Sequence, residues 1–210
     1  MIRLPNWRVR LVPAPLSCLH EPARGFTAGS PREGTNLSIP MDQPMTILGI
    51  DPGTKEMGIA VLRGQQLLAY GVHTLRNGER PYDLIGQARR VVLGYLERHA
   101  PDVVAIEAPL MLPTRRAAIL SVIAQELRGR AKELNLKVVE ITPQEVRQAV
   151  LGNPRATKID VAEALVRQGF GELKELIPKR PVRAALGLRP KDKYWLHMFD
   201  ALGLAVAAQG

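Results

Sequence analysis

Three acidic residues of the sequence stand where a negative charge is costly unless a cation or a polar partner meets it. Asp51 ends the apolar run at 47–50, Glu107 ends the run at 103–106, and Asp200 lies within a strongly apolar segment near the C-terminus. His197 precedes Asp200 by three residues, so a helix would present both side chains on one face. The four side chains can converge if that last helix lies across the two strands.

The chemistry that such a group favours is metal-dependent phosphodiester hydrolysis. Carboxylates crowded in a low dielectric need cations, and hard oxygen ligands select Mg²⁺ or Mn²⁺ over zinc. Two such ions about 3.5 to 4 Å apart can activate a water and stabilise the leaving oxygen of a phosphodiester. We therefore expect Mg²⁺, or Mn²⁺, with two ions per site. The predicted catalytic residues and metal ligands are Asp51, Glu107, His197 and Asp200.

Each of these residues also has an ordinary structural interpretation. Asp51 precedes Pro-Gly and could simply cap that turn. Glu107 could form a salt bridge with an arginine of the next helix, and His197 could be a core histidine with satisfied hydrogen bonds. Asp200 could pair with a lysine of the preceding loop. The residues alone leave these alternatives open.

The apolar periodicity predicts the elements that must position this group. Three strands are followed by a helix, a strand, a long helix, a strand and further helices, which is typical of an α/β domain with a mixed five-stranded sheet flanked by helices. Gly203 follows Asp200 on the same helical face, where it would leave space for close packing against a strand. The predicted strands cover 47–50, 59–61, 67–72, 102–107 and 137–141, and the predicted helices cover 82–100, 114–134 and 194–208, with others beginning at Pro143 and after Thr157.

The first 44 residues differ from the rest of the chain. They hold seven of the 17 prolines and show no hydrophobic period, so we expect a disordered extension at 1–44 and a nuclease domain at 45–210. Met41 and Met45 precede the first predicted strand, and either could be the true start of translation.

The charge of the chain favours an acidic partner. The net charge is +9 and the pI about 10.1, and nucleic acid is the commonest partner of such a protein. The single cysteine, Cys18, excludes an internal disulfide and fits a cytoplasmic protein, and no apolar run is long enough to span a membrane. The residues expected to bind the DNA backbone are Arg115, Arg116, Arg155, Lys158, Lys179, Arg180, Arg183, Lys191 and Lys193.

The sequence resembles the RuvC family of Holliday junction resolvases over residues 46–208. The motifs that carry the resemblance are ILGIDPGT, VVAIE, ITPQEVRQAVLGNPRATK and HMFDALGLAVA, of which the third is the most specific. The resemblance implies an RNase H-like fold and a homodimer that cuts four-way DNA junctions in recombination and repair, with a branch-migration motor as a further partner. It also implies that Asp51, Glu107 and Asp200 are the catalytic carboxylates, that His197 is the fourth member, and that Lys158 lies near the scissile phosphate. The long helix after Thr114 would contribute to the dimer.

The chain departs from that family in one loop. Leu110 stands where the family usually has an aromatic residue, within a loop that invades the junction. Two alternatives to a junction nuclease are a nucleic-acid-binding protein of the YqgF type on the same fold, non-catalytic or of different specificity, and an actin-like nucleotide-binding protein. The intact set of four site residues argues against the first, and the shortness of the chain argues against the second.

Overall fold

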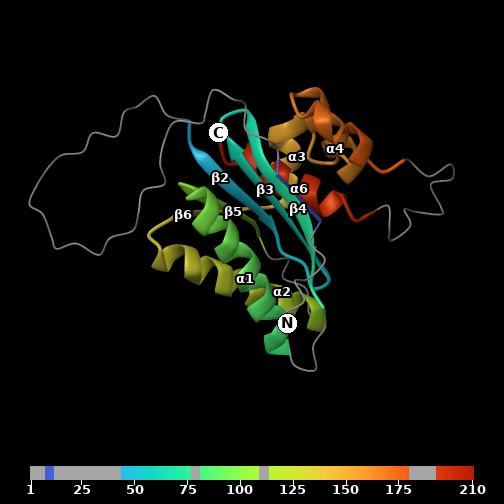
Figure 1. Cartoon of the computed structure of the whole chain (residues 1–210). Coiled ribbons are helices and arrows are strands. Elements are labelled where there is room, and N and C mark those ends of the chain that lie inside the picture. The colour runs from blue at the N-terminus through green and yellow to red at the C-terminus, as the bar shows by residue number, and fades with distance from the viewer. Residues whose placement is uncertain (1–7, 12–43, 77–80, 109–113, 180–192) are drawn as a thin grey trace, which may run out of the picture.

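The fold is built on a mixed β-sheet with the strand order β1-β4-β3-β2-β5-β6. This computed structural model describes residues 8–11, 44–76, 81–108, 114–179 and 193–210, and Figure 1 shows their arrangement. Neighbouring strands pair antiparallel from β1 to β2, whereas β5 and β6 continue from β2 in parallel. The strands are β1 (Arg8–Leu11), β2 (Thr46–Asp51), β3 (Glu56–Arg63), β4 (Gln66–Thr74), β5 (Val103–Glu107) and β6 (Lys137–Ile141).

Helices cover both faces of this sheet. α1 (Pro81–His99) and α2 (Arg115–Glu133) pack on one face, and α3 (Pro143–Leu151), α4 (Lys158–Arg167) and α6 (Leu196–Ala207) gather on the other (Figure 1). The short 3₁₀ helix η2 (Gly171–Leu176) packs against α4. The sheet therefore separates two apolar cores, and the polar ends of its strands are left for the site.

The alternation of side chains along the strands decides what faces α6. In β2, Leu48 and Ile50 belong to the core beneath α1 and α2, whereas Ile47 belongs to the opposite core. Because successive strand residues point to opposite faces, Asp51 is presented on the face of Ile47, toward α6. The same alternation in β5 places Glu107 on the α6 face, together with Ala105.

The helices near the site begin and end at residues with clear capping chemistry. Thr142 and Thr157 each form a capping box, with Glu145 and Asp160 respectively, at the starts of α3 and α4. Gly152 ends α3 in the left-handed conformation, with φ of 66°, which favours glycine. These caps fix the short connection that brings Lys158, the first residue of α4, to the sheet.

The predicted order of strands and helices is confirmed, and β2 to β6 form the predicted five-stranded mixed sheet. Within the predicted extension at 1–44, the structure describes residues 8–11, which form β1 and pair with the edge of β4. One expectation needs correction. Gly203 packs on Val146 of α3 and Val161 of α4, and the glycines that meet α6 are on the strands themselves. Among the described residues, no helix is long and apolar enough to cross a membrane.

A buried histidine makes the stability of the fold depend on pH. His73 of β4 is 3% exposed, its Nε2 lies 3.0 Å from the hydroxyl of Tyr95, and burial lowers its pKa to about 4. Below pH 6.5 the unfolded chain therefore binds more protons than the folded chain, and stability is lost as the pH falls toward 4. We expect the free energy of unfolding in urea to decrease by about 2 kcal/mol between pH 7 and pH 5 from this residue.

The pH effect of His73 can be isolated by substitution. A His73→Asn variant should be less stable at pH 7, but its free energy of unfolding should change less between pH 7 and pH 5 than that of the unmodified chain. Equal pH dependence in the two proteins would show that His73 is not the responsible group. His99, whose pKa burial also lowers, contributes in the same direction and remains in both proteins.

Candidate active site

The last helix, α6, lies directly on the sheet because two strand glycines leave room for its backbone. A Cβ atom on Gly49 would lie 2.0 Å from the carbonyl oxygen of Ala201, and one on Gly58 would lie 1.8 Å from that of His197. Gly58 is paired with Asp51 across β2 and β3, so the start of α6 sits above the end of β2. The last helix therefore lies across the strands, as the convergence of the acidic residues requires.

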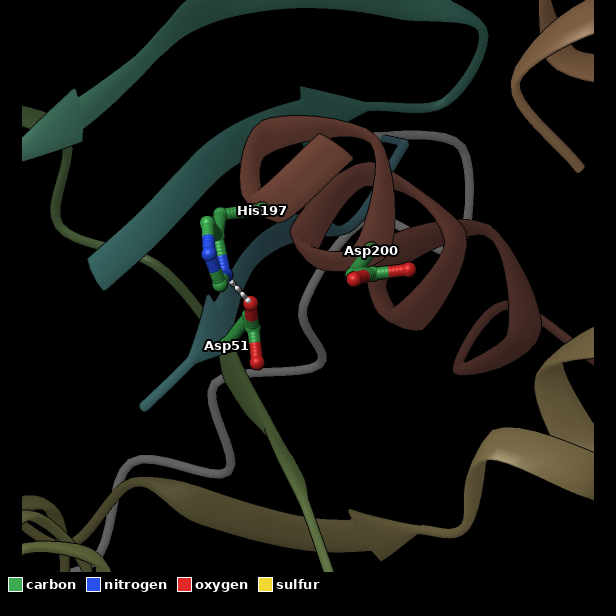
Figure 2. Close-up of side chains that lie close together, drawn as sticks. All are labelled: Asp51, His197 and Asp200. Atoms are coloured by element: carbon green, nitrogen blue, oxygen red, sulfur yellow. Dashed lines mark hydrogen bonds and ion pairs between the residues drawn. The ribbon is translucent and has the colours of Figure 1, made fainter. Parts of the chain in front are cut away.

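This crossing brings Asp51, His197 and Asp200 together, as Figure 2 shows. Nδ1 of His197 lies 2.6 Å from Oδ2 of Asp51. One ligand atom from each of the three residues falls within 4.8 Å of the others. Asp51 is 6% exposed, so its carboxylate is buried in this contact instead of only capping the turn that follows. His197 faces a carboxylate, which sets it apart from an ordinary core histidine.

Glu107 belongs to the same electrostatic group. It ends β5, which runs parallel to β2 with Ile106 opposite Ile50, and its side chain is half-buried. Burial, and after it the charges of Asp51 and Asp200, raises the pKa of Glu107 to about 7, although Lys158 and His197 oppose this. Glu107 thus lies beside the trio, while its role as a ligand stays a prediction.

The carboxylates of this site repel one another. Burial and the charge of Asp51 raise the pKa of Asp200 to about 6, against the opposing effect of Lys158. Burial is the larger cause of both raised pKa values, and the neighbouring carboxylates add to it. Clustered carboxylate oxygens and one imidazole are a donor set that suits Mg²⁺ or Mn²⁺, so the residues fit a divalent cation.

Lys158 is the cation that the chain itself brings to the acids. Its Nζ forms an ion pair with Asp200, whose side chain is 15% exposed. Burial lowers the pKa of Lys158, but the charges of Asp200 and Asp51 and the hydrogen bond to Asp200 outweigh it, so the pKa is raised. Within the described residues, the partner of Asp200 is this lysine of α4, and a lysine of the preceding loop is not seen in that place.

Two side chains near the site were not among the sequence candidates. Arg147 of α3 lines a hollow together with Glu107, Lys158 and Asp200. Glu56, at the start of β3, has Oε2 3.4 Å from Nε2 of His197. The sequence marks neither as a site residue: Arg147 only adjoins the buried Val146 on α3, and Glu56 only lies one hairpin turn beyond Asp51.

Of the predicted DNA-binding residues, Lys158 is the one that the described part of the chain places at the site. Arg155, Lys179 and Lys193 are exposed, as expected of residues that meet a backbone. Arg115 and Arg116 are the first residues of α2, but their side chains lie outside what the structure describes. The remaining candidates, and Leu110 of the departing loop, also lie outside the described residues: Arg180, Arg183 and Lys191.

Comparison with known proteins decides the family. A family model described as crossover junction endodeoxyribonuclease RuvC matches residues 47–186. The chain belongs to the RuvC family. The matched span includes Asp51, Glu107 and Lys158 and ends before α6, so His197 and Asp200 are placed by the structure and not by that match.

Individual RuvC proteins agree with this assignment. The chain is 34% identical over 132 residues to crossover junction endodeoxyribonuclease RuvC of Bacteroides fragilis, which covers 58% of this chain and 67% of that protein. It is 31% identical over 154 residues to the RuvC of Thermobifida fusca, covering 67% and 79%. The structure of Thermus thermophilus RuvC in complex with its Holliday junction substrate is 26% identical, with a TM-score of 0.58, and covers 78% of this chain and 91% of that one. The likeness confirms the expected RNase H-like fold.

Proposed function

We propose that this RuvC-family chain resolves Holliday junctions by hydrolysing phosphodiester bonds at Asp51, Glu107, His197 and Asp200. The observation that supports the proposal most directly is the convergence of Asp51, His197 and Asp200, whose ligand atoms lie within 4.8 Å of one another. Glu107 adds a third carboxyl group whose pKa is raised by burial and by the charge of Asp51. Carboxyl groups whose pKa values are raised by burial and by one another are typical of functional sites.

Divalent cations suit this group. Asp51, His197 and Asp200 would hold Mg²⁺ or Mn²⁺, with Glu107 beside them, and two bound ions would lower the pKa of the attacking water and neutralise charge on the phosphate. The water oxygen forms the new bond to phosphorus and the bond to the 3′ oxygen breaks. The products are a 5′-phosphate and a 3′-hydroxyl.

Two cationic side chains of the chain are placed to contact the DNA phosphate. Lys158 and Arg147 line the same hollow as Glu107 and Asp200, so a DNA backbone that reaches the acids also reaches these two cations. Lys158 forms an ion pair with Asp200, and it would be able to pair with a phosphate oxygen if divalent cations were bound by the carboxylates. The two residues would thereby hold the scissile phosphate beside Glu107 and Asp200.

Two copies of the site are required to cut a four-way junction symmetrically. The helix α2 exposes Val122 at 46%, and Leu134, just after its end, is 50% exposed. Exposed apolar residues on a long helix suit a homodimer contact, which agrees with the predicted role of this helix. A branch-migration motor stays a predicted partner.

The proposal is tested by comparing DNA structures of matched sequence. We expect a labelled four-way junction to be nicked symmetrically in Mg²⁺ or Mn²⁺, and matched duplex and Y-shaped DNA to remain intact. EDTA should abolish cleavage, because it removes the divalent cations that would activate the attacking water. Binding of the junction without cleavage in either metal would instead support the non-catalytic alternative.

The phosphate contacts of Lys158 and Arg147 predict a change in salt dependence. Each neutralised phosphate releases condensed counterions, so Lys158→Gln and Arg147→Gln should each reduce the slope of log K against log salt by about 1. Junction binding measured from about 50 to 200 mM salt gives this slope. Lys137→Gln is the matched control, because Lys137 is an exposed cation at the opposite end of the sheet from Glu107. A slope that is unchanged in all three variants would contradict the assignment.

A further inference from the structure

The imidazole of His197 lies between two carboxylates of the same hairpin. Its Nδ1 is 2.6 Å from Oδ2 of Asp51, and its Nε2 is 3.4 Å from Oε2 of Glu56. Glu56 is not one of the three residues whose ligand atoms converge, and its carboxylate lies at the ring nitrogen that Asp51 does not contact. The contact gives each ring nitrogen a separate anionic neighbour.

The position of Glu56 is fixed by the strand and the turn before it. Gly58, Ala60 and Leu62 of β3 lie on the α6 side of the sheet, and the alternation of strand side chains puts Glu56 on that side too. The turn is tight, because a Cβ atom on Gly53 would lie 1.7 Å from the carbonyl oxygen of Glu56. The nitrogen of Leu75 also donates to the carbonyl of Lys55 at 2.7 Å. The backbone therefore holds Glu56 under the first turn of α6.

The chemistry of a histidine ligand explains why a second carboxylate is useful. A ring nitrogen that binds a cation must be unprotonated, so the remaining proton has to reside on the other nitrogen. A carboxylate that accepts this proton in a hydrogen bond fixes the tautomer and the orientation of the ring, and raises the basicity of the ligating nitrogen. In this site Nδ1 faces Asp51 and would be the ligating nitrogen, and Nε2 faces Glu56.

We propose that Glu56 is the positioning residue of this site, holding the Nε2 proton of His197 so that Nδ1 is turned toward the cation held with Asp51. This role rests on the proposed function, since it requires that the site bind a divalent cation. Glu56 acts through His197 and is not one of the three residues whose ligand atoms converge. The hairpin from Asp51 to Glu56 thus supplies one carboxylate for each nitrogen of the ring.

The test is divalent cation binding by the chain alone, without DNA, measured by titration calorimetry with Mn²⁺. Glu56→Ala should weaken Mn²⁺ binding tenfold or more, the usual cost of losing a partner of a ligating histidine. Glu56→Gln keeps an oxygen that accepts from Nε2, so its affinity should stay within about threefold of the unmodified chain. Glu97→Ala removes the same charge from an exposed position on α1, across the sheet, and should leave the affinity unchanged.

A second variant shows whether the effect passes through His197. In a His197→Ala background, Glu56→Ala should cause no further loss of Mn²⁺ affinity, because the two residues act as one unit. Equal losses of Mn²⁺ affinity in Glu56→Ala and Glu56→Gln would indicate a simple charge effect and contradict the positioning role. An unchanged Mn²⁺ affinity in Glu56→Ala would also contradict it. If the unmodified chain bound no Mn²⁺, both the proposed function and the role of Glu56 would be overturned. If the unmodified chain bound Mn²⁺ and substitution of Glu56 left the affinity unchanged, the role of Glu56 alone would be overturned.

Discussion

Replacing Asp51 with asparagine is expected to reduce junction cleavage at least about a thousandfold, equivalent to about 4 kcal/mol of transition-state stabilisation. Asp51 ends the central strand, is 6% exposed and contacts His197 directly, so it is the carboxylate around which the rest of the group is assembled. An amide is a neutral and much weaker ligand for a hard cation than a carboxylate. Junction binding should remain within a few-fold, because the cations that meet the backbone are unchanged.

The same variant should not lose stability, and this distinguishes its effect from unfolding. The asparagine oxygen can still accept a hydrogen bond from His197, and removal of the Asp51 charge relieves Glu107 and Asp200, whose pKa values that charge raises. We expect a melting temperature in metal-free buffer that equals or exceeds that of the unmodified chain. Cleavage within tenfold of normal by a folded Asp51→Asn variant would contradict the role of Asp51.

The local structure of this chain could be predicted from its sequence because its signals are short-range. The spacing of Leu84, Ala88 and Tyr95 predicts α1, and Thr142 before Pro143 predicts the start of α3. Asp51 and Glu107 could be assigned to one end of the sheet because each ends a buried run. Such patterns depend on neighbours within a few residues, so they do not require knowledge of the tertiary structure.

The features that the sequence did not predict all depend on contacts between distant residues. Gly49 and Gly58 are the sequence signal for the packing of α6 on the sheet, since glycine within a strand often marks a close backbone approach. The neighbouring residues do not indicate that α6 is the element that packs there. Glu56 and Arg147 look like ordinary surface charges until α6 and α4 are placed beside them. The strand β1 pairs with β4 across about 60 residues of chain, and its four residues have no strong pattern of their own.

The site depends on close packing of the helix α6 on the strand β3. In Gly58→Ala, the new methyl group would lie 1.8 Å from the carbonyl oxygen of His197, so α6 must move by more than 1 Å. A displacement of that size at reacting groups can cost about a hundredfold in rate, and overpacking costs about 1–3 kcal/mol in stability. We therefore expect Gly58→Ala to lose at least about a hundredfold in junction cleavage and to unfold at lower urea concentration.

The matched control for this variant makes the same chemical change where there is space. Gly94 lies within α1 and a Cβ atom there would meet nothing within 4 Å, so Gly94→Ala should raise stability by up to about 1 kcal/mol and leave cleavage unchanged. At a temperature where Gly58→Ala remains folded, its Mn²⁺ affinity should also be reduced, because α6 carries both His197 and Asp200 away from Asp51. Normal junction cleavage by Gly58→Ala would show that close packing of α6 on Gly58 is not needed to place the α6 side chains beside Asp51. It would contradict the geometry described for the site.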